Sequence, residues 1–266
     1  MHEMREYSQN CFITLTYDDE NLPLDKSVHK SHLRKFIKNL RQNLQRDGKT
    51  EKIRYFGCGE YGTDQDLNQS VNHLGRPHYH AIIFGHDFED KTLHSSKRGN
   101  DLYTSEYLSK VWKKGHCTVQ EANFATAQYT AGYCVKKIGG DMAETHYQIT
   151  NLETGELTNV HPEFMACSTG NKDIKGIGSR WAKKYLSDLD KGFITNNGHK
   201  VPYPKYYNQF IIERENEAFY SDYQFQQDHK VNRVDSLDRD FTLDRLRVKE
   251  KVKLIRTQKL TQRKMQ

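Results

Sequence analysis

The pattern of hydrophobic and polar positions divides the first half of the chain into strands and helices. Residues 11–17 read Cys-Phe-Ile-Thr-Leu-Thr-Tyr, which predicts an early strand at the centre of a sheet. Residues 29–46 carry apolar side chains at helical spacing between lysines and arginines, which predicts an amphipathic helix with Ser31 as its N-cap. The apolar positions of this helix are Leu33, Phe36, Ile37, Leu40 and Leu44. Its basic face is typical of a solvated surface.

Two further strands are predicted on either side of a polar loop. Residues 52–60 form the first and residues 76–85 the second, which begins at Pro77 and contains an unbroken apolar run, Ala81 to Phe84. An unbroken run is typical of a strand buried on both faces. The loop of about a dozen residues favours an antiparallel pair, which would place Glu60 near the start of the second strand.

The later pattern predicts a short helix at 105–114, a strand at 116–120 and a helix at 122–137. Short strands and turns are expected from 141 to 173, with a hairpin tip at 151–158. Further predictions are a helix ending near 189, a hairpin at 192–203 and helix at 210–220. The expected fold is α+β, a central antiparallel sheet with helices packed on it. We expect a core at 1–140, an extension of the core at 141–220 that offers a possible DNA-binding surface, and a charged tail at 221–266, flexible or helical.

Composition narrows the class of partner. The chain has 266 residues, 35% hydrophobic and 29% charged, with a net charge of +6. This modest basic excess favours a polyanionic partner such as nucleic acid. The five cysteines are scattered without a Cys-x-x-Cys pair, which is typical of reduced thiols. No apolar run has membrane-spanning length and no signal peptide opens the chain, so we expect a cytoplasmic protein without a membrane partner.

His78 and His80 are the first candidate chemistry. Side chains alternate along a strand, so both imidazoles lie on one face, about 6 to 7 Å apart, while Tyr79 points to the other. Two imidazoles and the carboxylate of Glu60 would make a three-ligand metal site with positions open for substrate or water. Histidines at this spacing also occur as surface or hydrogen-bonded side chains, and a glutamate at a strand end is commonly solvated.

Tyr129 and Tyr133 are the second candidate. They lie four residues apart on the predicted helix, about 40° apart in projection, and Lys136 falls on the same stripe. A tyrosine hydroxyl attacks a phosphodiester when a metal ion polarises the phosphate, and a nearby lysine can steady the developing charge. Taken singly, such tyrosines are commonly core aromatics, and a lysine at a helix end commonly complements the helix dipole.

Four stretches together resemble the HUH endonucleases, and more narrowly the rolling-circle replication initiators of the Microviridae (gokushovirus-like). They are Phe12-Ile-Thr-Leu-Thr-Tyr17, Gly57-Cys-Gly-Glu-Tyr-Gly62, Arg76-Pro-His-Tyr-His-Ala-Ile-Ile-Phe-Gly85 and Tyr129-Thr-Ala-Gly-Tyr-Cys-Val-Lys-Lys137. Many relatives carry a Cys-rich segment upstream of the first strand, whereas here that strand lies almost at the start.

The resemblance implies a ferredoxin-like nuclease core that nicks double-stranded DNA at a phage origin, forms a 5′-phosphotyrosine link and later rejoins the displaced single strand into a circle. His78, His80 and Glu60 would bind Mg²⁺ or Mn²⁺, Tyr129 and Tyr133 would be the nucleophiles, and Lys136 would assist them. The partners implied are origin DNA, single- and double-stranded, and the host helicase and polymerase, in the cytoplasm of a bacterium.

Two other functions fit parts of the pattern. A transposase or plasmid relaxase would use the same two-histidine chemistry. A non-catalytic module that binds hairpin DNA would use the tyrosines to stack on bases and the histidines for hydrogen bonds.

Overall fold

The computed structural model describes residues 1–50, 52–63, 74–97, 99–150, 155–170, 175–196, 198–212 and 251–252, and only the backbone of 133–136 and 196. The chain divides into two compact units, Met1–Lys184 and Tyr185–Gln266. The domain boundaries expected near residues 140 and 220 remain predictions. The predicted tail at 221–266 lies almost wholly outside the described residues.

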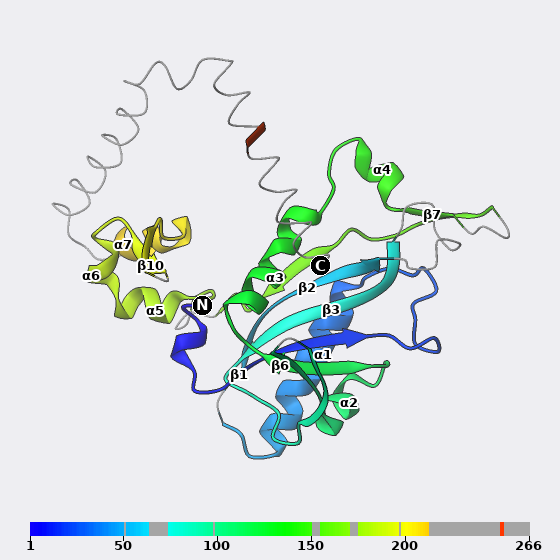
Figure 1. The fold of residues 1–266 in the computed structure, drawn as a ribbon, viewed down its shortest axis with the longest axis horizontal. Helices are drawn as coiled ribbons and strands as arrows, with labels where there is room; N and C mark the ends of the chain where they lie inside the picture. The colour runs from blue at the N-terminus through cyan, green and yellow to red at the C-terminus, as the bar shows by residue number, and fades with distance from the viewer. Residues whose placement is uncertain are drawn as a thin grey trace. The chain divides into compact units, whose positions relative to one another are not determined.

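The first unit is built on a seven-stranded antiparallel sheet in the order β4-β5-β6-β1-β3-β2-β9 (Figure 1). The strands are β1 (Asn10–Thr16), β2 (Arg54–Thr63), β3 (Leu74–Phe84), β4 (Thr92–Lys97), β5 (Asn100–Thr104), β6 (Cys117–Glu121) and β9 (Phe164–Cys167). This confirms the predicted α+β fold with a central antiparallel sheet. β3 lies between β1 and β2, so the two histidines are on an interior strand.

Helix α1 (Lys30–Arg46) covers one face of the sheet, as its hydrophobic pattern predicts (Figure 1). Its five predicted apolar positions are all buried, and they pack with side chains such as Ile13, Tyr79 and Ile83 in the main core. The predicted N-cap is wrong by two residues. The helix starts at Lys30, its N-cap is His29, and no side chain caps it. The backbone N–H of His29 instead donates to the Tyr79 hydroxyl at 3.0 Å, which satisfies one donor of the helix start.

Helix α3 (Phe124–Lys136) lies on the opposite face of the sheet (Figure 1). A smaller apolar cluster beneath it contains Tyr7, Phe12, Ile82 and Phe84, with Tyr129 packed against them. Ala81 to Phe84 are buried throughout, because alternate residues face the main core and this second cluster. The prediction of a strand buried on both faces is confirmed.

The remaining elements of the first unit are short. They are η1 (Met4–Glu6), α2 (Glu106–Trp112), α4 (Met142–His146), β7 (Gln148–Thr150), β8 (Leu157–Asn159) and α5 (Ser179–Lys184). β7 pairs with β8, as predicted for a hairpin whose tip, residues 151–154, lies outside the described residues. The β4–β5 hairpin and the edge strand β9 were not predicted individually.

The second unit contains α6 (Leu186–Leu189), β10 (Ile194–Asn196), β11 (His199–Val201), η2 (Lys205–Tyr207) and α7 (Asn208–Ile212). The β10–β11 pair confirms the predicted hairpin. α7 starts two residues before the predicted helix, whose part from 213 to 220 lies outside the described residues. Among the helices that the structure describes, none is long and apolar enough to cross a membrane.

A candidate metal and tyrosine site

The pairing of β2 with β3 brings the predicted metal ligands together. Glu60 and His78 are direct cross-strand partners in this antiparallel pair, so their side chains lie on the same face. Glu60 Oε1 is 2.9 Å from His78 Nε2 and 2.8 Å from His80 Nε2. Glu60 and His80 are buried, whereas 17% of the His78 side chain is exposed. The site is therefore open to substrate on the His78 side.

The outer nitrogens of both imidazoles are held by neighbouring groups. His78 Nδ1 lies 3.0 Å from the backbone oxygen of Arg76, to which it can only donate. His80 Nδ1 lies 2.9 Å from the hydroxyl of Thr14, its cross-strand partner in β1. With protons on the two Nδ1 atoms, both Nε2 lone pairs face Glu60, which is the arrangement that metal-binding histidines require.

The electrostatics of the site favour an ionised carboxylate. Burial raises the pKa of Glu60, but hydrogen bonds and charge interactions with His78 and His80 outweigh it and lower the pKa below its usual value. The three side chains therefore combine two neutral imidazoles with one anion.

These residues fit a divalent ion. The carboxylate and the two imidazoles offer one ligand atom each, close enough together to hold a common ion. Adjacent ligands of an octahedral ion with bonds near 2.1 Å lie about 3 Å apart, close to the 2.8 and 2.9 Å observed here. Imidazole and carboxylate ligands with open positions are typical of catalytic centres.

Tyr129 is brought to the site by α3. The helix begins with a capping box in which Asn123 Oδ1 accepts from the Thr126 N–H at 3.0 Å and Thr126 Oγ1 accepts from the Asn123 N–H at 2.8 Å. The start of the helix is thus fixed firmly against the sheet. The Tyr129 hydroxyl donates to Glu60 Oε1 at 3.4 Å, and its ring meets the His80 ring edge to face at 5.1 Å.

The other two helix candidates are placed only in part. Tyr133 and Lys136 lie on α3 one and two turns after Tyr129, as the predicted helix requires. Their side chains lie outside the described part of the chain, so their shared stripe and their roles stay predictions.

Sequence reasoning missed the groups that support the site. Thr14 and the Arg76 carbonyl orient the imidazoles, and only the strand pairing shows that they do so. Gly57 was quoted as part of a motif without a physical reason. A Cβ at this position would lie 2.6 Å from the backbone oxygen of His80, so the close approach of β2 to β3 requires a glycine here.

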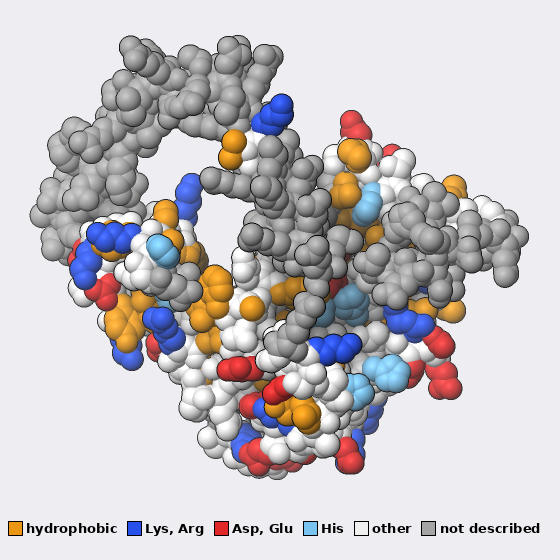
Figure 2. Space-filling model, in the orientation of Figure 1, with side chains coloured by type: hydrophobic (Ala, Val, Ile, Leu, Met, Phe, Trp, Pro, Cys, Tyr) orange, Lys and Arg blue, Asp and Glu red, His pale blue; other side chains and the backbone are white. Residues whose placement is uncertain are grey.

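The largest cavity of the first unit lies elsewhere. It measures about 560 Å³ and is lined by α1, the start of β2 and β9. Its basic lining residues are Lys30, Arg34, Arg41, Lys52, Arg54 and Arg180, and no acidic residue lines it. On the face shown in Figure 2, by contrast, acidic and basic side chains are interspersed. The cavity is therefore a candidate contact surface for a polyanion and is separate from the metal ligands.

Comparison with known proteins places the site in a family context. Residues 10–138 match the family model of the replication-associated protein ORF2. The chain is 30% identical over 217 residues to the replication-associated protein VP4 of Bdellovibrio phage phiMH2K, which covers 79% of this chain and 60% of that protein. It is 32% identical over 233 residues to the replication-associated protein ORF2 of Spiroplasma virus 4, covering 84% of this chain and 64% of that protein.

A third relative, the replication-associated protein ORF4 of Chlamydia phage 1, is 32% identical over 148 residues, which covers 53% of this chain and 34% of that protein. The chain thus spans less than two thirds of the length of these relatives. No solved structure matches the fold significantly. All six predicted site residues fall within the matched range 10–138.

Proposed function

The chain belongs to the replication-associated proteins of small phages, with residues 10–138 matching the ORF2 family, and from this premise we propose that it is a metal-dependent DNA nickase that starts rolling-circle replication. It cuts one strand of the double-stranded replicative form at the origin and stays attached to the new 5′ end through tyrosine. The observation that carries this proposal is the convergence of Glu60, His78 and His80 on one point that also faces the Tyr129 hydroxyl.

The three ligands position the reacting groups. A divalent ion bound by them, Mg²⁺ or Mn²⁺, would draw negative charge from the non-bridging oxygens of the scissile phosphate. Glu60 and His80 are buried and fix the ligand geometry, while the partly exposed His78 marks the side from which DNA enters. Packing of the Tyr129 ring on His80 and Phe12 holds the nucleophile beside this site.

Tyr129 then exchanges one phosphodiester for another. Its hydroxyl oxygen forms a bond to phosphorus as the bond from phosphorus to the 3′ oxygen breaks. The tyrosine proton is lost and the 3′ oxygen gains one, which leaves a free 3′-OH for a polymerase. The 5′-phosphotyrosine conserves the bond energy, so attack by a later 3′-OH rejoins the displaced strand into a circle.

A second tyrosine fits the two transfers of this cycle. Tyr133, one turn further along α3, would cut the next origin while Tyr129 still holds a 5′ end. Lys136 would steady the negative charge that develops at phosphorus. The partners are single- and double-stranded origin DNA and the host helicase and polymerase, in the cytoplasm of the bacterial host.

A nicking assay on supercoiled origin DNA with Mn²⁺ or Mg²⁺ tests the proposal. Wild type should give relaxed circles and a covalent protein–DNA adduct that survives denaturing electrophoresis. The double variant Tyr129→Phe with Tyr133→Phe should give neither product, whereas Tyr103→Phe, on β5, serves as a control that retains both. Adducts formed by the double variant would show that the nucleophile lies elsewhere.

The same assay separates the proposal from DNA binding without cleavage. Replacing His78 and His80 by alanine should abolish nicking and leave origin binding largely intact, because binding rests mainly on phosphate contacts. If neither wild type nor variant nicks the DNA while both bind it, the protein is a binding module. Transfer of the cut end into unrelated duplex DNA, instead of circle closure, would identify a transposase.

A further inference from the structure

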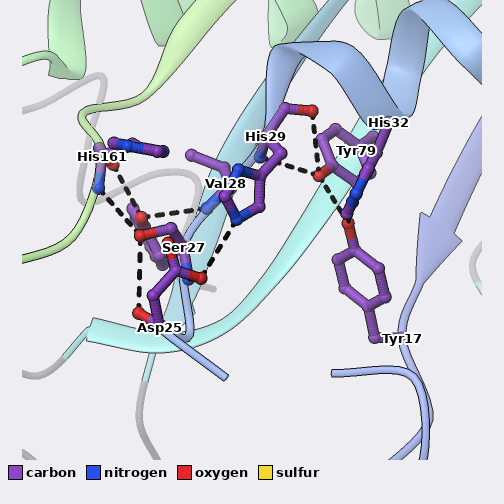
Figure 3. A network of polar contacts seen from close by, with 9 residues as sticks. Tyr17, Asp25, Ser27, Val28, His29, His32, Tyr79 and His161 are labelled. Carbon is purple, nitrogen blue, oxygen red and sulfur yellow. Dashed lines mark hydrogen bonds and ion pairs between the residues drawn. The ribbon is translucent and has the colours of Figure 1, made fainter. Parts of the chain in front are cut away.

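A second cluster of ligand-type side chains lies away from the nickase site. We propose that Asp25, His29 and His161 bind a divalent transition-metal ion, Zn²⁺, which ties the start of α1 to the segment before β9. Their ligand atoms all lie within 4.8 Å of one another. Figure 3 shows the three side chains gathered from two segments that are far apart in the sequence.

The two segments are fixed to each other by buried hydrogen bonds. The N–H of His161 donates to Ser27 Oγ at 3.0 Å, and its carbonyl accepts from the Tyr61 hydroxyl at 2.6 Å. The same hydroxyl accepts from the Val28 N–H at 3.1 Å. Ser27, Val28 and Tyr61 are all buried. The backbone of His161 is therefore held at both of its polar groups, which places its side chain beside the other two ligands.

The spacing and chemistry of the ligands suit zinc. Asp25 Oδ1 lies 3.0 Å from His29 Nε2, and the rings of His29 and His161 meet at right angles with centroids 5.0 Å apart. Ligands of a tetrahedral zinc ion with bonds near 2.0 to 2.1 Å lie about 3.3 Å apart, so small side-chain rotations suffice. Two imidazoles and one carboxylate form a three-ligand zinc set, with water in the fourth position.

An ion pair without metal explains only part of this arrangement. Asp25 and His29 are four residues apart and partly exposed, and such a pair contributes little to stability. It gives no role to His161, which is itself exposed and is contributed by a separate segment. The positive end of the α1 dipole disfavours a cation here, but the Tyr79 hydroxyl accepts from the His29 N–H and Asp25 supplies a full negative charge.

The second site is separate from the nickase ligands but shares strand β3 with them. Tyr79 lies between His78 and His80 in sequence, and its side chain points to the other face of the sheet. Its hydroxyl accepts from the His29 N–H at 3.0 Å and donates to the His29 carbonyl at 3.2 Å. The segment of His161 leads into β9, which pairs with β2, the strand of Glu60. A metal ion here would brace the strands that carry the nickase ligands without touching substrate.

Zinc stoichiometry of the metal-stripped full chain tests this proposal without any DNA. The nickase site also offers nitrogen and oxygen ligands, so wild type should bind two Zn²⁺, measured by plasma mass spectrometry after gel filtration. The His78→Ala, His80→Ala variant should retain one, and His29→Ala with His161→Ala should also retain one. The variant with all four substitutions should bind none, and His94→Ala, an exposed histidine on β4, should bind two.

Thermal unfolding supplies a second measurement that does not depend on nicking. Zinc at about 100 times its dissociation constant should raise the melting temperature of the His78→Ala, His80→Ala variant by about 5 °C or more. The rise should vanish when Asp25→Asn, which keeps the side-chain shape, is added. If the His78→Ala, His80→Ala variant binds no zinc, the second site does not exist. If the His29→Ala, His161→Ala variant matches wild type in stoichiometry, the ligands are wrong. Neither result bears on the proposed nickase, which the Tyr129 and Tyr133 variants test.

Discussion

Glu60 and His78 face each other across the β2–β3 pair, and one carboxylate oxygen of Glu60 lies 2.9 Å from Nε2 of His78. The same oxygen lies 2.8 Å from His80 Nε2 and 3.4 Å from the Tyr129 hydroxyl. One buried oxygen thus connects both imidazoles with the proposed nucleophile. Because it is the only anion among the three ligands, the affinity for a divalent ion should depend strongly on it.

Replacing Glu60 by glutamine should therefore weaken Mn²⁺ binding by at least about 100-fold, since the change removes the anionic ligand and keeps its size. Nicking at limiting Mn²⁺ should fall in parallel. Titration calorimetry of the metal-stripped protein measures the affinity, with Glu121→Gln, an exposed acid at the end of β6, as the control. In wild type Mn²⁺ should bind more tightly than Mg²⁺, because imidazole nitrogen is a poor ligand for Mg²⁺. Equal Mn²⁺ affinity in the Glu60 and Glu121 variants would remove Glu60 from the metal site.

The sequence predicted the metal ligands because strand geometry alone determines the first step. Side-chain alternation puts His78 and His80 on one face, and a short loop between neighbouring strands makes an antiparallel pair with Glu60. The helix at residues 30–46 was equally clear, since one amphipathic face had to be buried.

Other features depend on pairings that no local pattern contains. Thr14 supports His80 only because β1 pairs with β3 in one particular alignment. His161 reaches Asp25 from a distant part of the sequence. The hairpin β4–β5 is mostly exposed and polar, so its strands lack the apolar alternation by which strands are predicted.

Gly57 supports a prediction about stability. Alanine at this position would place Cβ 2.6 Å from the His80 carbonyl oxygen and 2.9 Å from the Ala81 Cβ. Backbone cannot yield as a flexible side chain can, so β2 and β3 must move apart. We expect a loss of about 1 to 3 kcal/mol in the free energy of unfolding, together with weaker metal binding because His80 is displaced.

Urea denaturation measures this loss, and Gly139→Ala is the matched control. A Cβ at Gly139 meets nothing within 4 Å, so that substitution should change stability little. If both variants unfold at the same urea concentration as wild type, the close approach of the two strands does not constrain the residue at position 57.

His86 should make stability depend on pH. It is buried, its ring packs edge to face on Phe88 at 4.7 Å, and burial lowers its pKa below the ordinary value of 6.5. Asp87, Glu89 and Asp90 act to raise this pKa and Lys49 to lower it, but burial dominates. The unfolded chain therefore binds a proton at a pH where the folded protein does not. The stabilising contribution is complete above pH 6.5 and is lost as the pH falls towards the folded pKa, by at most about 1.4 kcal/mol per pH unit.

Comparing His86→Gln with His94→Gln isolates this effect. The first variant should flatten the fall in unfolding free energy between pH 6.5 and about pH 5, whereas the exposed His94 should leave the wild-type slope unchanged. Identical slopes in wild type and both variants would assign the acid sensitivity of the protein to other groups.

The basic cavity beside α1 predicts how the protein holds DNA. Two of its arginines already have structural partners: Arg41 donates to the Ile53 carbonyl, and Arg54 forms a buried ion pair with Glu3 at 2.7 Å. Lys30, Arg34 and Lys52 line the same cavity and are the basic side chains best placed to contact phosphates. Each such contact releases a counterion, so replacing Arg34 and Lys52 by glutamine should weaken binding to any DNA sequence and reduce the slope of log K against log salt by about 0.9 per contact. Fluorescence anisotropy over a salt series measures that slope, with Lys110→Gln on α2, an exposed partner of Glu106, as the control. Because the cavity is separate from the metal ligands, Mn²⁺ affinity should be unaffected. An unchanged salt slope in the double variant would move the DNA path to another surface.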